Sequence, residues 1–240
     1  MIIKVCGMRD RENIRQLCQL PVDMMGMVFC PDSPRYVGLV SSRAGLTPDY
    51  SHERLQQLSR PATEAEADDR TASAGQPKRV GVFRNEMPQT IITRIYNHQL
   101  DYVQLHGEET PTLIRNLRLT LDPDLRPGIR FIKAIGVATK DDLKRAADYQ
   151  DSADLLLFDT QCRQGGGSGR QFDWDLLQAY EGQLPFLLSG GIGPDDAGRV
   201  LQFSHPRFLG IDLNSRFETE PGLKDIELLK AFIHKVKGNG

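Results

Sequence analysis

The feature that most constrains the fold is an alternation of two kinds of segment along nearly the whole chain. Short runs rich in apolar and β-branched residues, typical of buried strands, alternate with longer amphipathic segments, typical of helices. The predicted strands are Ile2–Cys6, Asp23–Phe29, Arg79–Phe83, Tyr102–Leu105, Phe131–Ile135, Ala153–Phe158, Pro185–Leu188 and Phe208–Ile211. The predicted helices lie near Asp10–Gln19, Pro48–Ser59, Glu86–His98, Glu109–Arg118, Thr139–Tyr149, Asp173–Tyr180, Pro194–Gln202 and Lys224–Lys237. Eight such units in 240 residues predict an α/β fold, a single-domain (β/α)8 barrel.

A doubly wound open sheet is the alternative architecture. The turn after its first strand usually carries the pattern GxGxxG, which is absent after Cys6, so the barrel is favoured. The segment from Arg60 to Lys78 interrupts the alternation, because it is rich in Pro, Ala, Ser and acidic residues and has almost no large apolar side chain. Such a segment cannot bury a face, so we expect a flexible surface insertion at about residues 60–78 within one barrel spanning residues 1–240.

Composition narrows the classes of partner. The net charge of −2 gives no reason to expect nucleic acid or an anionic membrane as partner, and no apolar run approaches the ~20 residues that span a bilayer. Cys6, Cys18, Cys30 and Cys162 show no CxxC spacing, so neither a metal site nor a disulfide framework is indicated. We therefore expect a protein of the reducing cytoplasm, present as a monomer or homodimer.

Reactive or polar residues follow six of the eight predicted strands. Catalytic groups of (β/α)8 barrels come from these positions, where the carboxyl ends of the strands share one rim. The residues are Cys6, Arg35, His106, Asp159, the pair Gly190 and Gly191, and Asp212 with Asn214 and Ser215. Each one alone would be an ordinary turn or loop residue. Their concentration at one rim predicts an active site there.

The residues after the last two strands predict the class of ligand. Gly190 and Gly191 follow the seventh strand, and Asn214 and Ser215 follow the eighth. Barrels commonly build a phosphate site from backbone N–H groups at these two positions, and glycine lets the backbone approach the phosphate oxygens closely. A small phosphorylated molecule is therefore the expected ligand.

Strand periodicity predicts a pair of acid–base groups. Alternate residues of a strand face the same side, so Cys6 shares a face with Lys4, and Asp159 shares a face with Leu155 and Leu157. If both faces point inward, a thiol and a carboxyl group flank one pocket, as proton-transfer chemistry requires. A free thiol titrates near ~8.5, so we expect Lys4 to help electrostatically by favouring the thiolate.

Seven separated motifs carry a family resemblance. They occur in the order KVCGMR, FCPDSPRYV, VGVF, VQLHGEE, LLLFDT…GGSG..FDW, LSGGI and GIDLNSRFE…PGLKD. Each falls at a strand end, and together they are spread over nearly the whole chain apart from the insertion from Arg60 to Lys78. The chain thus resembles the phosphoribosylanthranilate isomerases of tryptophan biosynthesis.

The resemblance implies an Amadori rearrangement of N-(5-phosphoribosyl)anthranilate without metal or cofactor. It implies that Asp159 is the general acid on the furanose ring oxygen and Cys6 the general base at C2. Arg35 would pair with the anthranilate carboxylate, the glycines of LSGGI and the turn after Asp212 would hold the phosphate, and Asp212 would lie near the substrate. His106 is expected to line the pocket as a polar wall residue.

One position departs from the family pattern, and two other functions compete. The family usually reads VSSGVE after the last strand, whereas this chain has Arg216 where a glycine is common, which alters the expected phosphate site. A different phosphosugar barrel enzyme, such as indole-glycerol-phosphate synthase or a histidine-pathway isomerase, is one alternative. The histidine-pathway isomerase normally works with two aspartates, so Cys6 argues against it. A catalytically silent phosphate-binding barrel is the other alternative, and the presence of both Cys6 and Asp159 argues against that.

Overall fold

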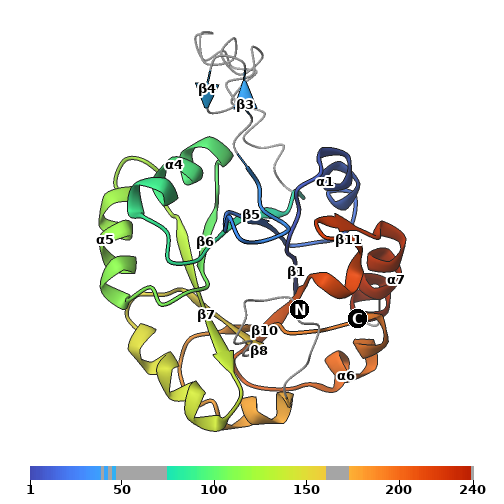
Figure 1. Ribbon diagram of the computed structural model, residues 1–240. Coiled ribbons are helices and arrows are strands. Elements are labelled where there is room, and N and C mark those ends of the chain that lie inside the picture. The colour runs from blue at the N-terminus through green and yellow to red at the C-terminus, as the bar shows by residue number, and fades with distance from the viewer. Residues whose placement is uncertain (39–40, 43–44, 47–74, 161–172, 239–240) are drawn as a thin grey trace.

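Eight parallel strands close into a barrel, and helices form a ring around them (Figure 1). The computed structural model describes residues 1–38, 41–42, 45–46, 75–160 and 173–238. The barrel order is β1-β10-β9-β8-β7-β6-β5-β2. Its strands are β1 (Ile2–Val5), β2 (Met24–Val28), β5 (Lys78–Phe83), β6 (Tyr102–Leu105), β7 (Arg130–Val137), β8 (Leu155–Thr160), β9 (Phe186–Leu188) and β10 (Phe208–Leu213). Every predicted strand overlaps one of these, so the predicted (β/α)8 barrel is confirmed.

The helices begin where the sequence offers capping side chains. The α-helices are α1 (Arg11–Leu17), α4 (Pro88–His98), α5 (Pro111–Leu121), α6 (Ala197–Gln202) and α7 (Ile226–Lys237). Asp10, Thr110 and Asp225 precede three of them and accept hydrogen bonds from the backbone N–H groups of the first turn. Two predicted helices are 3₁₀ helices instead, η1 (Lys140–Tyr149) and η2 (Trp174–Ala179), and two shorter ones are η3 (Pro194–Asp196) and η4 (Ser215–Phe217). None of the helices within the described ranges is long and apolar enough to cross a membrane.

Two of the approximate predicted segments include residues that belong to strands in the structure. Lys78 belongs to β5 and not to the predicted insertion, because it pairs with Met24 of β2 and donates its N–H to the Asp23 carbonyl. The last helix does not begin at Lys224. A hairpin of β11 (Glu218–Glu220) and β12 (Leu223–Lys224) comes first, and the backbone of Lys224 exchanges two hydrogen bonds with the Asn13 side chain.

Other predictions concern parts of the chain that are only partly described. The predicted helix near Pro48–Ser59 and residues 60–74 of the predicted insertion lie outside the described residues. A separate pair of very short strands, β3 (Ser41–Ser42) and β4 (Gly45–Leu46), is antiparallel and does not join the barrel sheet.

The two faces of the barrel strands are as the sequence periodicity predicts. Leu155 and Leu157 of β8 pack in the apolar cluster inside the barrel, whereas Leu156 and Phe158 pack in the cluster between the strands and the helices. Cys6 follows β1 and packs with Val28 and Val82, at the carboxyl ends of β2 and β5. The inward face of each strand thus leads from an apolar interior to the polar rim.

Candidate active site

The Cys6 thiol lies buried immediately after β1. Its backbone N–H donates to the Leu213 carbonyl at 2.8 Å, which fixes the residue beside β10. Gly26 leaves room for the thiol, because a Cβ atom at that position would come within 2.7 Å of the Cys6 Sγ. Burial raises the pKa of Cys6 above its ordinary value, and the positive charges of Lys4 and Lys224 act in the opposite direction.

A buried ion pair of Lys4 and Asp212 lies close to the Cys6 thiol. Lys4 and Asp212 are register partners in β1 and β10, and the Lys4 Nζ is 2.9 Å from the Asp212 Oδ1. Burial raises the pKa of Asp212, against the opposing effect of Lys4 and with a further upward contribution from the nearby Asp159. Lys4 also interacts with the Cys6 thiol, so one ammonium group connects the thiol with the Asp212 carboxylate.

Replacing Lys4 with Met is expected to raise the pKa of the Cys6 thiol further. The change removes the charge that most favours the thiolate and leaves Asp212, which disfavours it. The measurement is the ultraviolet absorbance of the thiolate against pH, in protein whose other three cysteines are Ser. An unchanged titration of Cys6 in the Lys4→Met protein would remove Lys4 as its electrostatic partner.

Asp159 lies at the end of β8 with its carboxylate partly open to solvent. Its Oδ2 is 3.3 Å from the Nε2 of His106, and its Oδ1 accepts the Thr160 N–H at 2.8 Å. The His106 Nδ1 is 3.2 Å from the Gln104 Nε2, so the imidazole ring is held from both sides. With 16% of its side chain exposed, Asp159 can reach a ligand that the fully buried Lys4 cannot.

The turn after β9 adjoins the end of β8. Gly190 and Gly191 have φ values of 93° and 70°, in the left-handed region that favours glycine. A Cβ atom on Gly190 would collide with Thr160 and lie 3.1 Å from the Asp159 Oδ1. The predicted phosphate-binding turn is thus in contact with the predicted acid.

We expect Gly190→Ala to lower both stability and activity. A methyl group there meets backbone and side-chain atoms of β8 at an unfavourable φ, which costs roughly 1–3 kcal/mol and displaces Asp159. Urea unfolding and turnover would measure the two effects. Gly198→Ala is the matched control, because nothing lies within 4 Å of its Cβ position in α6, and it is expected to lose neither property. Equal behaviour of the two variants would contradict the argument.

The loop after β10 lies beside the loop after β9. A Cβ atom on Gly193 would lie 3.7 Å from the Arg216 Cβ, and Ser215 begins η4 directly after Asn214. The side-chain oxygen of Asn214 accepts a hydrogen bond from Lys224 at 2.8 Å. Asn214 therefore has only its backbone and its amide nitrogen to offer a phosphate, and Arg216 is exposed at the edge of the loop.

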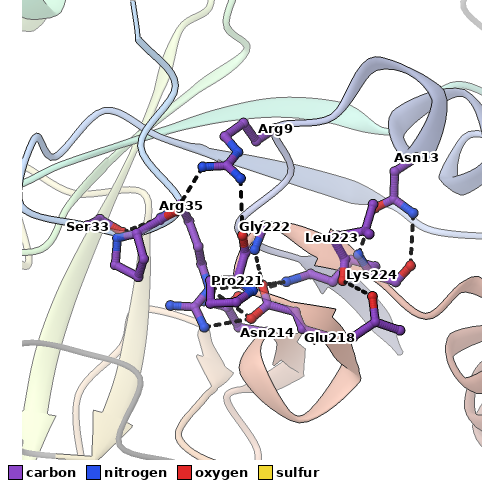
Figure 2. Close-up of polar contacts among 12 residues, drawn as sticks. Arg9, Asn13, Ser33, Arg35, Asn214, Glu218, Pro221, Gly222, Leu223 and Lys224 are labelled. Atoms are coloured by element: carbon purple, nitrogen blue, oxygen red, sulfur yellow. Dashed lines mark hydrogen bonds and ion pairs between the residues drawn. The ribbon is translucent and has the colours of Figure 1, made fainter.

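Arg35 belongs to a charged cluster that sequence reasoning identified only in part (Figure 2). Its guanidinium donates to Glu218, with Nε 2.8 Å from Oε1 and Nη2 2.6 Å from Oε2. Lys224 donates to the same carboxylate, with Nζ 2.5 Å from Oε1. Glu218 and Lys224 belong to the motif GIDLNSRFE…PGLKD, but the sequence pattern alone indicates no role for them. They pair with each other in the β11–β12 hairpin, which the sequence pattern does not predict.

Fold and site together define a (β/α)8 barrel with acid–base groups at the carboxyl ends of its strands. Residues 47–235 match the family model described as N-(5'phosphoribosyl)anthranilate (PRA) isomerase. A relative from Parabacteroides distasonis named N-(5'-phosphoribosyl)anthranilate isomerase is 42% identical over 236 residues, covering 98% of this chain and 93% of the relative. The chain therefore belongs to the N-(5'-phosphoribosyl)anthranilate isomerase family.

Solved structures agree with this family membership. The phosphoribosyl anthranilate isomerase from Thermotoga maritima is similar with a TM-score of 0.73 and 32% identity, covering 99% of this chain and 100% of that one. A second isomerase structure of this family was solved in complex with reduced 1-(o-carboxyphenylamino)-1-deoxyribulose 5-phosphate. It is similar with a TM-score of 0.69 and 30% identity, covering 99% of this chain and 100% of that one.

Proposed function

We propose that the chain catalyses the Amadori rearrangement of N-(5-phosphoribosyl)anthranilate to 1-(2-carboxyphenylamino)-1-deoxy-D-ribulose 5-phosphate. It is an isomerase of tryptophan biosynthesis, as its family membership and its 42% identical relative support. The observation that carries the residue assignment is the approach of two reactive groups to one ion pair. Cys6 interacts with Lys4, Lys4 binds Asp212 with its Nζ 2.9 Å from Oδ1, and the Asp159 carboxylate is close enough to Asp212 to raise the pKa of that group.

Asp159 is the proposed general acid of the first step. Its carboxyl group protonates the furanose ring oxygen, the bond from C1 to that oxygen breaks, and the lone pair of the anilino nitrogen forms a C1=N Schiff base. Asp159 suits this role because its side chain is partly exposed at the rim and oriented by His106 and the Thr160 N–H. His106 would then be a polar wall residue that positions the acid.

Cys6 is the proposed general base of the second step. Its thiolate removes the proton from C2. The electron pair of the C2–H bond then forms a C1=C2 double bond, and the C1=N π electrons move to the protonated nitrogen, which gives a neutral enolamine. Protonation at C1 and loss of the hydroxyl proton at C2 then give the ketose. Lys4 stabilises the thiolate before the step, and Asp212, held by Lys4, lies near the substrate.

The charged ends of the substrate would be held on two sides of these groups. Arg35 would bind the anthranilate carboxylate, which a guanidinium fork suits geometrically. Gly190, Gly191 and Ser215, with the backbone of Asn214, would surround the phosphate. The reaction needs one acid and one base, so we propose that no cofactor takes part. A location in the cytoplasm and a monomeric or homodimeric state stay predictions.

The direct test is the loss of anthranilate-ribose fluorescence when purified protein is added to N-(5-phosphoribosyl)anthranilate. We expect a rapid, protein-dependent decrease without added metal or cofactor. A silent phosphate-binding barrel would instead bind the reduced product analogue while the fluorescence stayed unchanged. That outcome would reject the proposed catalysis in favour of a binding function.

A further inference from the structure

Glu218 occupies only one edge of the Arg35 guanidinium. The side edge, formed by Nε and Nη2, donates three hydrogen bonds to the two carboxylate oxygens, at 2.6 to 3.0 Å. The described residues provide no partner for the remaining Nη1. A guanidinium can bind a second carboxylate through its end edge, so Arg35 keeps donors for a ligand.

Two cations share the Glu218 carboxylate. Lys224 donates to Oε1 at 2.5 Å, and the Gly222 N–H donates to the same oxygen at 3.1 Å. Within the described part of the chain, neither Arg35 nor Lys224 forms an ion pair with any other carboxylate. With all three groups ionised, the cluster of Arg35, Glu218 and Lys224 therefore carries a net charge of +1.

This excess charge is buried, where it acts strongly. The side chains of Lys224, Glu218 and Arg35 are 0%, 4% and 10% exposed. Asn13 fixes the position of Lys224, because its side-chain oxygen accepts the Lys224 N–H at 2.8 Å and its amide donates to the Lys224 carbonyl at 2.9 Å. A charge held in a low-dielectric region interacts more strongly with a ligand than one on the surface.

The cluster borders the residue that follows the proposed base. A Cβ atom on Gly7 would lie 2.7 Å from the Arg35 Cδ and 3.2 Å from the Lys224 Nζ. Gly7 has a φ of 81° and directly follows Cys6, so the cluster forms the wall of the rim beside the thiol. A carboxylate that reached the free edge of Arg35 would therefore place the rest of its molecule near Cys6.

We propose that Lys224 is a specificity-determining residue, whose ammonium offsets Glu218 so that Arg35 keeps its charge for the aromatic carboxylate of the substrate. The inference rests on the proposed function and extends it from Arg35 to a residue that need not touch the ligand. Without Lys224, Arg35 and Glu218 would form a neutral pair with little attraction for an anion. The selected ligand class is an N-aryl aminosugar phosphate with a carboxylate on the aryl ring.

The test compares two unreactive ligands by calorimetry. One is the reduced product analogue, and the other is the same compound without its ring carboxylate. Their affinity ratio is the carboxylate preference. We expect Lys224→Met to lower this preference roughly tenfold or more, the effect of one partly screened charge. Lys237→Met is the matched control, because Lys237 pairs with Asp23 outside the cluster, and its preference is expected to equal that of the wild type.

A second substitution separates charge balance from lost packing. In Lys224→Met with Glu218→Gln, Arg35 is again the single net charge, so the carboxylate preference is expected to return to near the wild-type value. Glu218→Gln alone removes the single carboxylate of the cluster and is expected to raise the carboxylate preference above the wild-type value. Unchanged preference in Lys224→Met, or no recovery in the double variant, would overturn the proposal. If Lys224→Met does not fold, a preference that falls in Glu218→Gln would overturn it instead.

The same measurements distinguish this inference from the proposed function. A wild-type protein that binds with a carboxylate preference but turns over no substrate would contradict the proposed catalysis and leave the charge balance intact. If the wild-type protein turns over substrate and the Lys224→Met protein keeps its carboxylate preference, the proposed catalysis is supported and the charge-balance proposal is contradicted. An equal loss of affinity for both ligands in Lys224→Met would show a merely structural role.

Discussion

Asp159→Asn is expected to abolish measurable turnover and leave the barrel folded. The amide keeps the size of the side chain and its hydrogen-bonding oxygen toward the Thr160 N–H, but it cannot donate an acidic proton to the ring oxygen. Loss of a general acid typically costs ~10²–10⁴ in rate, and here ring opening precedes every later step. The measurement is the fluorescence assay, with binding of the reduced product analogue as evidence that the pocket is intact.

Asp154 provides a matched control, because it directly precedes β8, at the end of the strand away from Asp159. The Asp154 Oδ2 accepts the Phe131 N–H at 2.7 Å and pairs with Arg118 at 2.8 Å, away from the rim. Asp154→Asn is therefore expected to lower the free energy of unfolding and to keep the turnover number. Turnover within tenfold of the wild type in Asp159→Asn would remove Asp159 as the acid.

The barrel could be predicted from the sequence because its signal is local and repeated. A run such as Leu155–Phe158, apolar on both faces, is typical of a parallel strand covered by helices, and the structure shows its alternate residues in two separate apolar clusters. Strand parity then predicts the inward direction of Lys4, and the Lys4–Asp212 pair agrees with it. Periodicity is a property of neighbouring residues, so it needs no knowledge of distant contacts.

The charged cluster could not be predicted because its contacts join distant parts of the chain. Arg35 and Glu218 are 183 positions apart, and neither lies in a periodic segment. The hairpin that carries Lys224 is only two residues long on its second strand, too short for a period-2 pattern to be recognised. The resemblance implies that Arg35 binds a carboxylate of the substrate, but its partner within the protein, Glu218, depends on tertiary structure.

Cys6→Ser is expected to reduce turnover by at least ~10²–10⁴, because a serine hydroxyl does not ionise in the range where a thiol does. The smaller oxygen fits the space that Gly26 leaves beside the Sγ, so the fold is expected to persist. Cys18→Ser is the matched control, since Cys18 caps the end of α1 and takes no part in the proposed mechanism. Turnover in Cys6→Ser that stays within tenfold of the wild type would exclude the thiol as the base.

The pH dependence of kcat/KM gives a second and independent test of Cys6. Burial raises the pKa of its thiol, so below that pKa the active thiolate fraction increases about tenfold with each pH unit. As pH increases, kcat/KM of the wild type is therefore expected to rise until the pH reaches the raised pKa of Cys6. This rising limb should be absent from the residual activity of Cys6→Ser. Lys4→Met removes a charge that favours the thiolate, so the limb should move to higher pH. A limb that persists in Cys6→Ser, or that moves to lower pH in Lys4→Met, would assign the titration to another group.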